Sequence, residues 1–189
     1  AGWLGFLQVW ESARKLNQVV LDIARQANLD LISFPPSASL FSQKGQVVSW
    51  NTASLEHALE NGLIPLVYGD VVFDKVLGGT IFSTEELFAH LATVLHPSRI
   101  LLAGKEEAVF ADYPRNQHPI RHISRLAGLE SYLESSDNQD VTGGMRSKVF
   151  QMQAICNANP GTSVEIFRAS LPGELFKALS GTHSGTIIS

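Results

Sequence analysis

Residues 62–74 of the chain read Gly62-Leu-Ile-Pro-Leu-Val-Tyr-Gly-Asp-Val-Val-Phe-Asp74. The run 63–68 is apolar throughout, which predicts a strand buried on both faces, as in parallel sheets. Gly69 and Asp70 follow at the carboxyl end of this predicted strand. Ligands of open α/β sheets bind beyond that end of the strands. We therefore regard Gly69 and Asp70 as candidates for a binding site.

The segments on either side alternate between helical and extended patterns. Ser83-Thr84-Glu85-Glu86 is a capping box that begins a helix ending near residue 95. Ser54 is expected to cap a shorter helix, and Gly78-Gly79 is expected to form a turn. The other segments are predicted helices at 9–27, 54–60, 145–158 and 172–179, and strands at 29–34, 99–103, 163–167 and 186–188. This alternation predicts one α/β domain over residues 1–189, a three-layer α-β-α sandwich with a mainly parallel sheet.

The segment Asp140-Val-Thr-Gly-Gly-Met-Arg-Ser-Lys148 has a composition typical of phosphate sites. Gly143 and Gly144 let a ligand approach the backbone closely. The helix that follows directs free N–H groups and its positive dipole end at the same place, and Lys148 adds a cation. These features suit a phosphate whose charge grows during transfer. The alternative is a simple turn followed by a solvated lysine.

Two acidic positions are further candidates. Asp70 lies where it can organise a substrate or a catalytic lysine, although aspartate also forms turns without any catalytic role. Glu86 is expected to act as the capping residue. Glu85 is the more interesting carboxylate, although acidic residues are common in a first helical turn because they favour the helix dipole.

Composition limits the possible partners and compartments. The net charge is −4 without a basic block, which argues against nucleic acid as a partner. No apolar run approaches the roughly 20 residues that span a bilayer. The single cysteine, Cys156, fits a reducing cytoplasm and is expected to be a small buried helix residue. His118 and His122 are four apart, but Pro119 argues against a regular helix between them, so no metal site is predicted.

The order of these motifs resembles the isopentenyl phosphate kinases of the amino-acid-kinase superfamily. Residues 62–74 resemble the signature of the family's second half, and Gly79-Thr-Ile-Phe-Ser83 follows at the expected place. The most specific match is Asp140-Val-Thr-Gly-Gly-Met-x-x-Lys148. It is followed by Leu171-Pro-Gly173, Ala178-Leu-x-Gly181 and Gly185-Thr-Ile187. The resemblance covers nearly the whole chain and is weakest before residue 55.

The resemblance implies a kinase that transfers the γ-phosphoryl group of ATP, with Mg²⁺, to isopentenyl phosphate. It implies a homodimer in which the helix 9–27 lines the pocket for the isoprenoid tail, and the single cysteine indicates a cytoplasmic location. The implied catalytic residues are Lys148, Asp70 and Glu85, and the implied substrate-binding residues are Gly69 and Asp70. The implied nucleotide-binding residues are Gly104, Lys105, Thr142, Gly143, Gly144, Met145 and Lys148.

The chain also departs from the family pattern. The family begins with a strand carrying Lys-x-Gly-Gly and a glycine-rich loop ending in histidine. We expect both to lie upstream of residue 1, which is Ala, and to be needed for activity. The chain then corresponds to the C-terminal two-thirds of the fold, with 1–61 on the acceptor side and 62–189 on the nucleotide side. Glu85 replaces a family aspartate, and Gly104-Lys-Glu-Glu-Ala-Val-Phe110 replaces Thr-Asp-Val-Asp-Gly-Val-Tyr.

These departures leave two alternative functions open. The altered segment 104–110 is compatible with a kinase of the same fold whose acceptor is a nucleoside monophosphate or an acidic metabolite. Glu85 and Lys105 are also compatible with a non-catalytic paralogue that binds a ligand.

Overall fold

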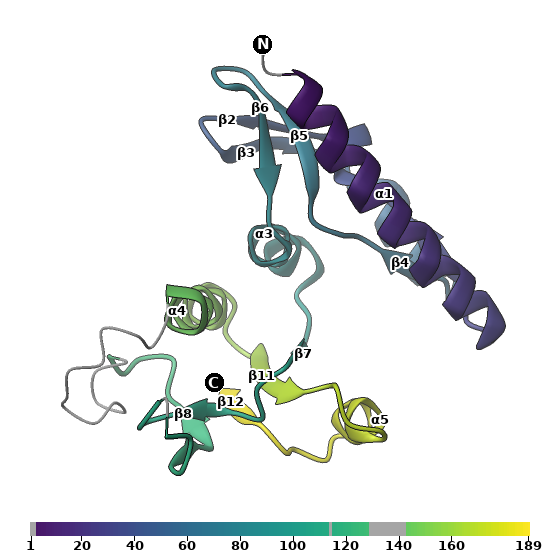
Figure 1. Cartoon of the computed structure of the whole chain (residues 1–189). Helices are drawn as coiled ribbons and strands as arrows, with labels where there is room; N and C mark the ends of the chain where they lie inside the picture. Colours follow the sequence, from purple (N-terminus) through teal and green to yellow (C-terminus); the bar gives the residue numbers. More distant parts are fainter. Residues whose placement is uncertain (1–2, 114, 129–142) are drawn as a thin grey trace. The chain divides into compact units, whose positions relative to one another are not determined.

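Residues 3–113, 115–128 and 143–189 are described by the structure, which is a computed structural model (Figure 1). The chain divides into a first unit, Ala1–His90, and a second unit, Leu91–Ser189. The two units are described separately below. The sequence predicted a boundary at residue 61 between an acceptor side and a nucleotide side of the active site. That boundary is one of function, and it stays a prediction.

The first unit combines helices with two small sheets. Its elements are α1 (Trp3–Gln26), β1 (Leu31–Ser33), the 3-10 helix η1 (Pro36–Ala38), β2 (Leu40–Gln43), β3 (Gln46–Trp50), α2 (Ala53–Glu60), β4 (Ile64–Leu66), β5 (Asp70–Asp74), β6 (Gly78–Phe82) and the start of α3 (Thr84–Leu95). The strands β1 and β4 pair in parallel, and a four-stranded sheet has the order β3-β2-β5-β6. In that sheet β2 and β5 are parallel, whereas the two hairpins are antiparallel. Leu40, Val72, Phe82 and Leu87 form its core.

Helix α1 begins six residues before the predicted start at Val9, because its first turns make tertiary contacts. The rings of Trp3 and Phe6 pack against each other and against Phe73 of β5, with centroid separations of 5.3–5.9 Å. The helix ends at Gln26, and Asn28 follows two residues later with a positive φ of 56°, as is common just after a helix C-terminus. These aromatic contacts attach the start of α1 to the β5–β6 hairpin.

Two predictions around this hairpin were wrong. The apolar run 63–68 forms only the short strand β4, and Ile64 is 45% exposed, so this strand is not buried on both faces. Gly78 and Gly79 lie within β6, and the turn is made by residues 75–77. Gly78 still needs its glycine backbone, because its φ is +80°.

The reason for this turn is Asp74, a buried carboxylate at the end of β5. Its oxygens accept hydrogen bonds from the amides of Val76 and Leu77, 2.8 Å away in the same turn. They also accept bonds from the Ser42 hydroxyl and from the amides of Lys44 and Gly45 in the β2–β3 turn. Burial by itself raises the pKa of Asp74, but these hydrogen bonds outweigh it and hold the pKa far below its usual value. One side chain therefore fixes two turns.

Asp74→Asn is expected to lower the melting temperature at pH 7, because the amide cannot accept all of these bonds. A lowered folded pKa contributes stability above the ordinary value of about 3.9, and this contribution is lost as pH falls further. The wild-type melting temperature should therefore fall towards that of the variant below about pH 4. The control is Asp22→Asn, an exposed residue of α1 that pairs with Arg25. Parallel curves for wild type and Asp74→Asn would contradict this role.

Helix α3 begins as the sequence predicts. The Ser83 amide donates to Glu86 Oε2 at 2.6 Å, and the Glu86 amide donates to Ser83 Oγ at 3.2 Å. The capping box is therefore confirmed. The predicted cap of α2 was wrong by two residues, because the N-cap is Thr52 and not Ser54. The Thr52 hydroxyl instead donates to Glu56 Oε1 at 2.6 Å.

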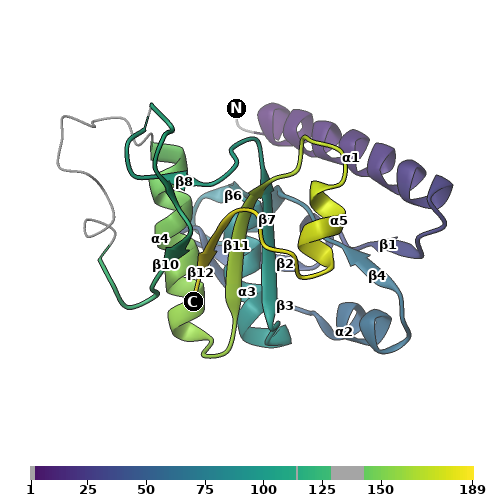
Figure 2. The same ribbon diagram turned by 90° about the horizontal axis from the view of Figure 1, so that it is seen from below.

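The second unit is a mixed sheet with helices packed on it (Figure 2). Its elements are the end of α3, β7 (Arg99–Gly104), β8 (Val109–Phe110), β9 (Pro119–Ile120), β10 (His122–Ile123), α4 (Gly143–Ala158), β11 (Ser163–Arg168), α5 (Glu174–Leu179) and β12 (Thr186–Ile188). The order is β10-β12-β11-β7, in which β11 is parallel to β7 and antiparallel to β12. β8 and β9 form a separate antiparallel pair.

Helix α4 packs its apolar side on β11 and β12. Val149, Met152 and Cys156 of this helix are fully buried, as are Val164 and Phe167 of β11. The prediction that Cys156 is a buried helix residue is confirmed, and burial raises the pKa of its thiol. The α/β fold class is likewise confirmed, and its sheets contain antiparallel as well as parallel strand pairs. Within the described ranges, no helix has both the length and the apolar character needed to cross a membrane.

Candidate active site

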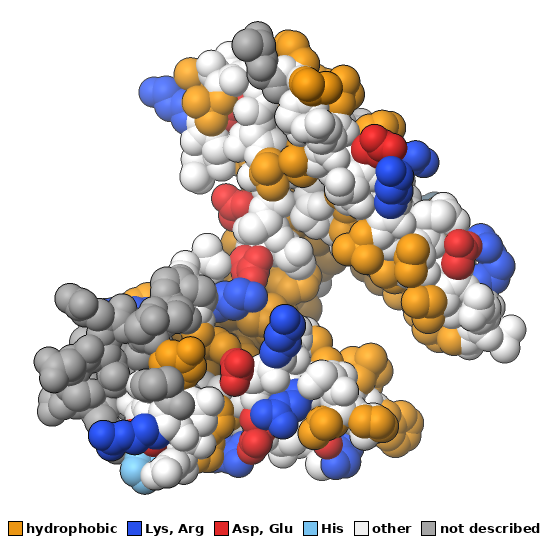
Figure 3. Space-filling view, viewed as in Figure 1, with side chains coloured by type: hydrophobic (Ala, Val, Ile, Leu, Met, Phe, Trp, Pro, Cys, Tyr) orange, Lys and Arg blue, Asp and Glu red, His pale blue; other side chains and the backbone are white. Residues whose placement is uncertain are grey.

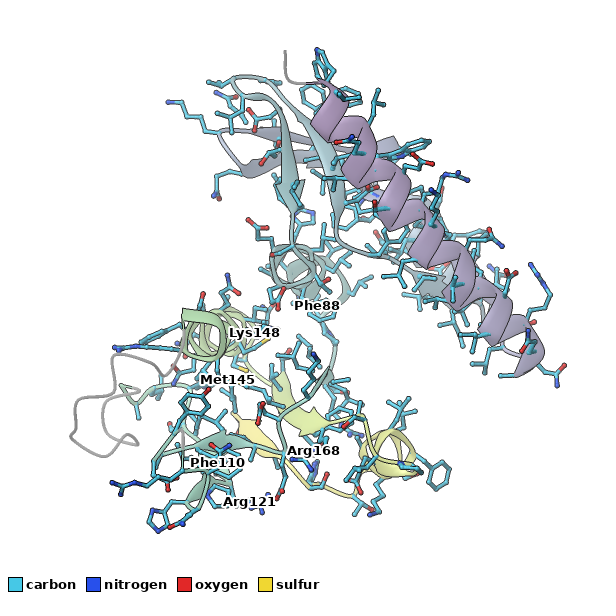
Figure 4. All side chains as sticks on the ribbon, viewed as in Figure 1. Phe88, Phe110, Arg121, Met145, Lys148 and Arg168 are labelled. Atoms are coloured by element: carbon cyan, nitrogen blue, oxygen red, sulfur yellow. The ribbon has the colours of Figure 1, made fainter. Side chains whose placement is uncertain are left out.

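A cavity of about 430 Å³ in the second unit, which we call the β7–α4 cavity, gathers several of the predicted site residues. Its lining residues are Leu102, Ala103, Gly104, Lys105, Glu106, Ala108, Val109, Phe110, Tyr113, Met145, Lys148 and Ile166. Figure 4 shows Met145 and Lys148 on α4 and Phe110 on β8. The lining is mainly apolar, with two lysines and one glutamate. Such a cavity can accept a flat apolar ring together with an anionic group.

The local structure explains how these side chains meet. Strand β7 ends at Gly104, and the loop after it is held by Arg168, whose Nε donates to the Lys105 carbonyl oxygen at 3.1 Å. Met145 and Lys148 are three residues apart in the first turns of α4, so they lie on the same side of the helix. The cavity therefore lies between the carboxyl end of a parallel strand and the beginning of a helix, where anions bind favourably.

The structure thus brings four of the predicted nucleotide-binding residues to one cavity: Gly104, Lys105, Met145 and Lys148. Gly143 and Gly144 begin α4, whereas the sequence analysis placed them just before the helix. Thr142 lies outside the described residues. The role of all these residues in nucleotide binding stays a prediction.

The sequence analysis missed the apolar part of this lining. Phe110 lies on β8, Tyr113 lies in the turn after it, and Ile166 lies on the buried strand β11. In the sequence, apolar residues of this kind cannot be told from ordinary core residues. For Phe110 and Tyr113, the available signal was their proximity to Gly104 and Lys105 along the chain.

A second cavity, of about 780 Å³, lies in the first unit between α1 and the β5–β6 hairpin, and we call it the α1–β6 cavity. Its lining residues are Trp3, Gly5, Phe6, Val9, Val71, Leu77, Gly78, Gly79, Thr80 and Ile81. All the side chains are apolar except that of Thr80. Leu77 and Ile81 are 60% and 58% exposed, so apolar surface is open to solvent here.

Phe6 lines the α1–β6 cavity beside Gly79. A Cβ atom added to Gly79 would lie 2.7 Å from the ring of Phe6, so the absence of a side chain at Gly79 makes room for this ring. The helix predicted from the sequence begins at Val9, so it leaves out Trp3 and Phe6. Trp3 and Phe6 are three residues apart, which is the spacing that puts two rings on one helical face.

Asp70 lies in the first unit, and its contacts there are with backbone groups of the fold. The side chain is fully buried, and its oxygens accept hydrogen bonds from the amides of Ser37, at 3.1 Å, and Val71, at 2.9 Å. Burial and the nearby charge of Asp70 raise the pKa of Tyr68. A Cβ atom added to Gly69 would lie 3.2 Å from the Phe82 carbonyl oxygen, so close packing favours glycine there. Catalysis or substrate binding by Asp70 and Gly69 stays a prediction.

Glu85 lies in the first turn of α3 and is partly exposed, while its neighbour Glu86 forms the capping box. The capping role therefore belongs to Glu86 and not to Glu85. Its proposed catalytic role is a prediction that a conservative substitution can test.

Glu85→Asp is expected to change kcat in the full-length protein, because one methylene moves the carboxylate by about 1 Å and such a shift can cost roughly 10²-fold in rate. A faster variant would indicate a site that has drifted from an aspartate-based ancestor. A slower variant would indicate surroundings adapted to glutamate. Glu86→Asp is the matched control and should affect stability more than rate. An unchanged kcat for Glu85→Asp would mean that Glu85 is only a first-turn acid.

Known proteins resemble nearly all of this chain. The model of the amino acid kinase family matches residues 8–167. The isopentenyl phosphate kinase of Methanothermobacter thermautotrophicus is 32% identical over 94% of this chain and 67% of its own length. That of Methanocaldococcus jannaschii is 28% identical over 97% of this chain and 67% of its own length. The chain thus spans about two thirds of these relatives.

Solved structures agree with the sequence comparisons. An isopentenyl phosphate kinase structure superposes with a TM-score of 0.83 at 26% identity, covering 98% of this chain and 70% of its own. The UMP kinase of Ureaplasma parvum superposes with a TM-score of 0.55 at 16% identity over 92% of this chain and 66% of its own, a likeness of fold alone.

Proposed function

The chain belongs to the amino acid kinase family, and we propose that it is the larger part of an isopentenyl phosphate kinase. In the proposed reaction, an oxygen of the acceptor phosphate attacks the γ-phosphorus of ATP. The bond from this phosphorus to the oxygen of the β-phosphate breaks, which gives isopentenyl diphosphate and ADP. Another acceptor and a non-catalytic paralogue are the weaker alternatives, because the relatives named above are isopentenyl phosphate kinases.

The observation that carries the choice of acceptor is the α1–β6 cavity. Its side chains are apolar apart from Thr80, so it offers no charged partner to an amino acid or a nucleoside. A five-carbon hydrocarbon tail, by contrast, gains about 25 cal/mol for each Å² of apolar surface removed from water. The cavity therefore suits the tail of isopentenyl phosphate, and α1 would wall it as the sequence resemblance implied.

We assign the nucleotide to the β7–α4 cavity. Phe110 and Tyr113 are suited to contact the base, and Lys105 and Lys148 are suited to contact phosphates. Lys148 would meet the charge that develops on the transferring phosphoryl group. This assignment keeps the nucleotide-binding role predicted for Gly104, Met145 and the glycines that begin α4.

Mg²⁺ is part of the proposal as the partner of the ATP phosphates. Among residues 3–113, 115–128 and 143–189, no group of three or more His, Cys, Asp or Glu side chains could hold a metal ion. Mg²⁺ at nucleotide sites is bound mainly by phosphate oxygens and water, with one or two carboxylates. We therefore propose that it enters with ATP and does not occupy a separate protein site.

We also propose a homodimer, which is supported by the exposed apolar side chains of α1. Leu16, Val19 and Ile23 lie in the second half of this helix and are 66%, 53% and 60% exposed. Figure 3 shows hydrophobic side chains along α1, beside charged ones. Apolar surface of this kind is typical of protein interfaces. A cytoplasmic location is proposed because the single cysteine, Cys156, is a free thiol.

An acceptor panel tests the proposed function. Release of ADP by the full-length protein would be followed with isopentenyl phosphate, UMP, acetylglutamate and no acceptor, each with ATP and Mg²⁺. We expect kcat/KM to be highest for isopentenyl phosphate. A preference for UMP or for the acidic metabolite would support a different kinase of this fold. Nucleotide binding without turnover of any acceptor would support the non-catalytic alternative.

A further inference from the structure

The Gly185-Thr186 segment at the beginning of β12 has no role in the function proposed above. Thr186 is fully buried. Its Oγ1 accepts a hydrogen bond from the Val109 amide at 2.8 Å and donates one to the Ile120 carbonyl oxygen at 2.6 Å. One hydroxyl therefore joins β12 to both strands of the β8–β9 pair.

The strands joined by this hydroxyl form walls of the β7–α4 cavity. Val109 and Phe110 of β8 line the cavity, and Val109 is opposite Ile120 in the antiparallel register with β9. On its other side, Thr186 is opposite Ile166 of β11, which also lines the cavity. The hydroxyl thus connects the β8 wall to the sheet that carries the β11 wall.

The residues before Thr186 hold it in place. A Cβ atom added to Gly185 would lie 1.9 Å from the Ile166 carbonyl oxygen, so only glycine lets the chain pass here without displacing β11. The Ser184 amide donates to Oε1 of Glu165, a buried carboxylate of β11, at 3.1 Å. His183 Nδ1 lies 2.8 Å from the other oxygen of Glu165. The position of the Thr186 hydroxyl is therefore fixed by contacts with β11.

We propose that Thr186 is a positioning residue for nucleotide binding, because its hydroxyl holds the β8 wall of the β7–α4 cavity at the spacing that the nucleotide requires. The proposal rests on the proposed function, since it takes this cavity as the ATP site. Without the hydroxyl, the buried Val109 amide and Ile120 carbonyl group both lose a hydrogen-bond partner. A buried polar group without a partner is costly, so the β8–β9 pair is expected to shift until these groups find another.

The test compares ATP binding in two matched variants of the full-length protein. Thr186→Val keeps the shape of the side chain and removes the hydroxyl. We expect the Kd and KM for ATP to rise about tenfold, with little change in kcat or in the KM for the acceptor. The control is Thr162→Val, because Thr162 is also buried and donates to a carbonyl oxygen, that of Pro97, at 2.6 Å. Thr162 precedes β11 at the amino end of this strand, and it does not line the cavity.

Both variants should lower the melting temperature, but only Thr186→Val should weaken ATP binding. Thr186→Ser restores the hydroxyl and should bind ATP as the wild type does. If Thr186→Val does not fold, the pair Thr186→Ser and Thr186→Ala gives the same comparison, because they differ by one hydroxyl. An unchanged Kd for ATP in Thr186→Val or Thr186→Ala would overturn the proposal, as would equal weakening in Thr162→Val.

The same titrations separate this proposal from the proposed function. A wild-type protein that binds ATP but does not phosphorylate isopentenyl phosphate contradicts the acceptor, and the comparison of ATP Kd values still decides the role of Thr186. A wild-type protein that binds no nucleotide overturns both.

Discussion

Lys148→Ala in the full-length protein is expected to lower kcat about 10²-fold or more, with a smaller change in the KM for ATP. Lys148 lines the β7–α4 cavity from the first turns of α4. A cation in that position interacts more strongly with the transition state than with bound ATP, because negative charge develops on the oxygens of the transferring phosphoryl group. Its removal therefore raises the barrier more than it weakens binding. Steady-state kinetics with both substrates varied would measure the two effects separately.

The matched control for this prediction is Lys177→Ala. Lys177 lies on α5 in the same unit, is 53% exposed and pairs with Glu174 at 2.8 Å. It does not line the β7–α4 cavity, so its removal should leave kcat and both KM values unchanged. An unchanged kcat in Lys148→Ala would mean that Lys148 is a solvated surface lysine without a catalytic role.

The second large effect is expected for Phe6→Ala, which should allow longer isoprenoid monophosphates to react. The Phe6 ring lines the α1–β6 cavity and packs on Trp3 and Phe73 at centroid separations of 5.3 Å. Its removal extends the cavity by about the volume of the ring. The ratio of kcat/KM for a ten-carbon monophosphate over the five-carbon one should rise tenfold or more, since apolar pockets discriminate by roughly 10- to 200-fold per methylene.

Phe176→Ala serves as the control for the loss of an aromatic ring. Phe176 of α5 is 74% exposed and lines neither cavity, so its removal should leave the acceptor preference unchanged. If Phe6→Ala lowers the melting temperature but keeps the same acceptor ratio, the α1–β6 cavity does not hold the isoprenoid tail.

Local interactions made part of the fold predictable. The capping box of Ser83 and Glu86 depends on two residues three apart, and it forms as the sequence predicts. The helix that carries Cys156 and the strand 163–167 were likewise predicted from periodicity and apolar composition. In each case the signal lies within one element, so the rest of the chain is not needed to read it.

Interactions between distant segments explain the failures. The turn after β5 depends on Asp74, whose partners Ser42 and Gly45 are 32 and 29 residues away. The early start of α1 depends on contacts of Trp3 and Phe6 with Phe73. A sequence pattern over a few residues contains no information about partners so far along the chain, and propensity alone therefore misplaced both boundaries.

The predictions for the candidate site succeeded and failed for the same reasons. Lys148 was predicted from its place after a Gly-Gly turn at a helix start, and Gly104 and Lys105 were implied by the family resemblance; the structure places these three at one cavity. Thr186 was not predicted to have a role, because its partner Val109 is 77 residues away. A buried threonine in an apolar strand looks like an ordinary core residue until the strands it joins are known.

The most direct test of the proposed function is the fate of the γ-phosphoryl group. The full-length protein would be incubated with Mg²⁺, isopentenyl phosphate and ATP labelled in the γ-phosphate, and the products would be identified by phosphorus NMR. The proposed function predicts that the label appears as the terminal phosphate of isopentenyl diphosphate, with an equal amount of ADP. Label that remains in ATP or appears only as inorganic phosphate would contradict it, as would label transferred to UMP or an acidic metabolite, but not to isopentenyl phosphate, in parallel incubations.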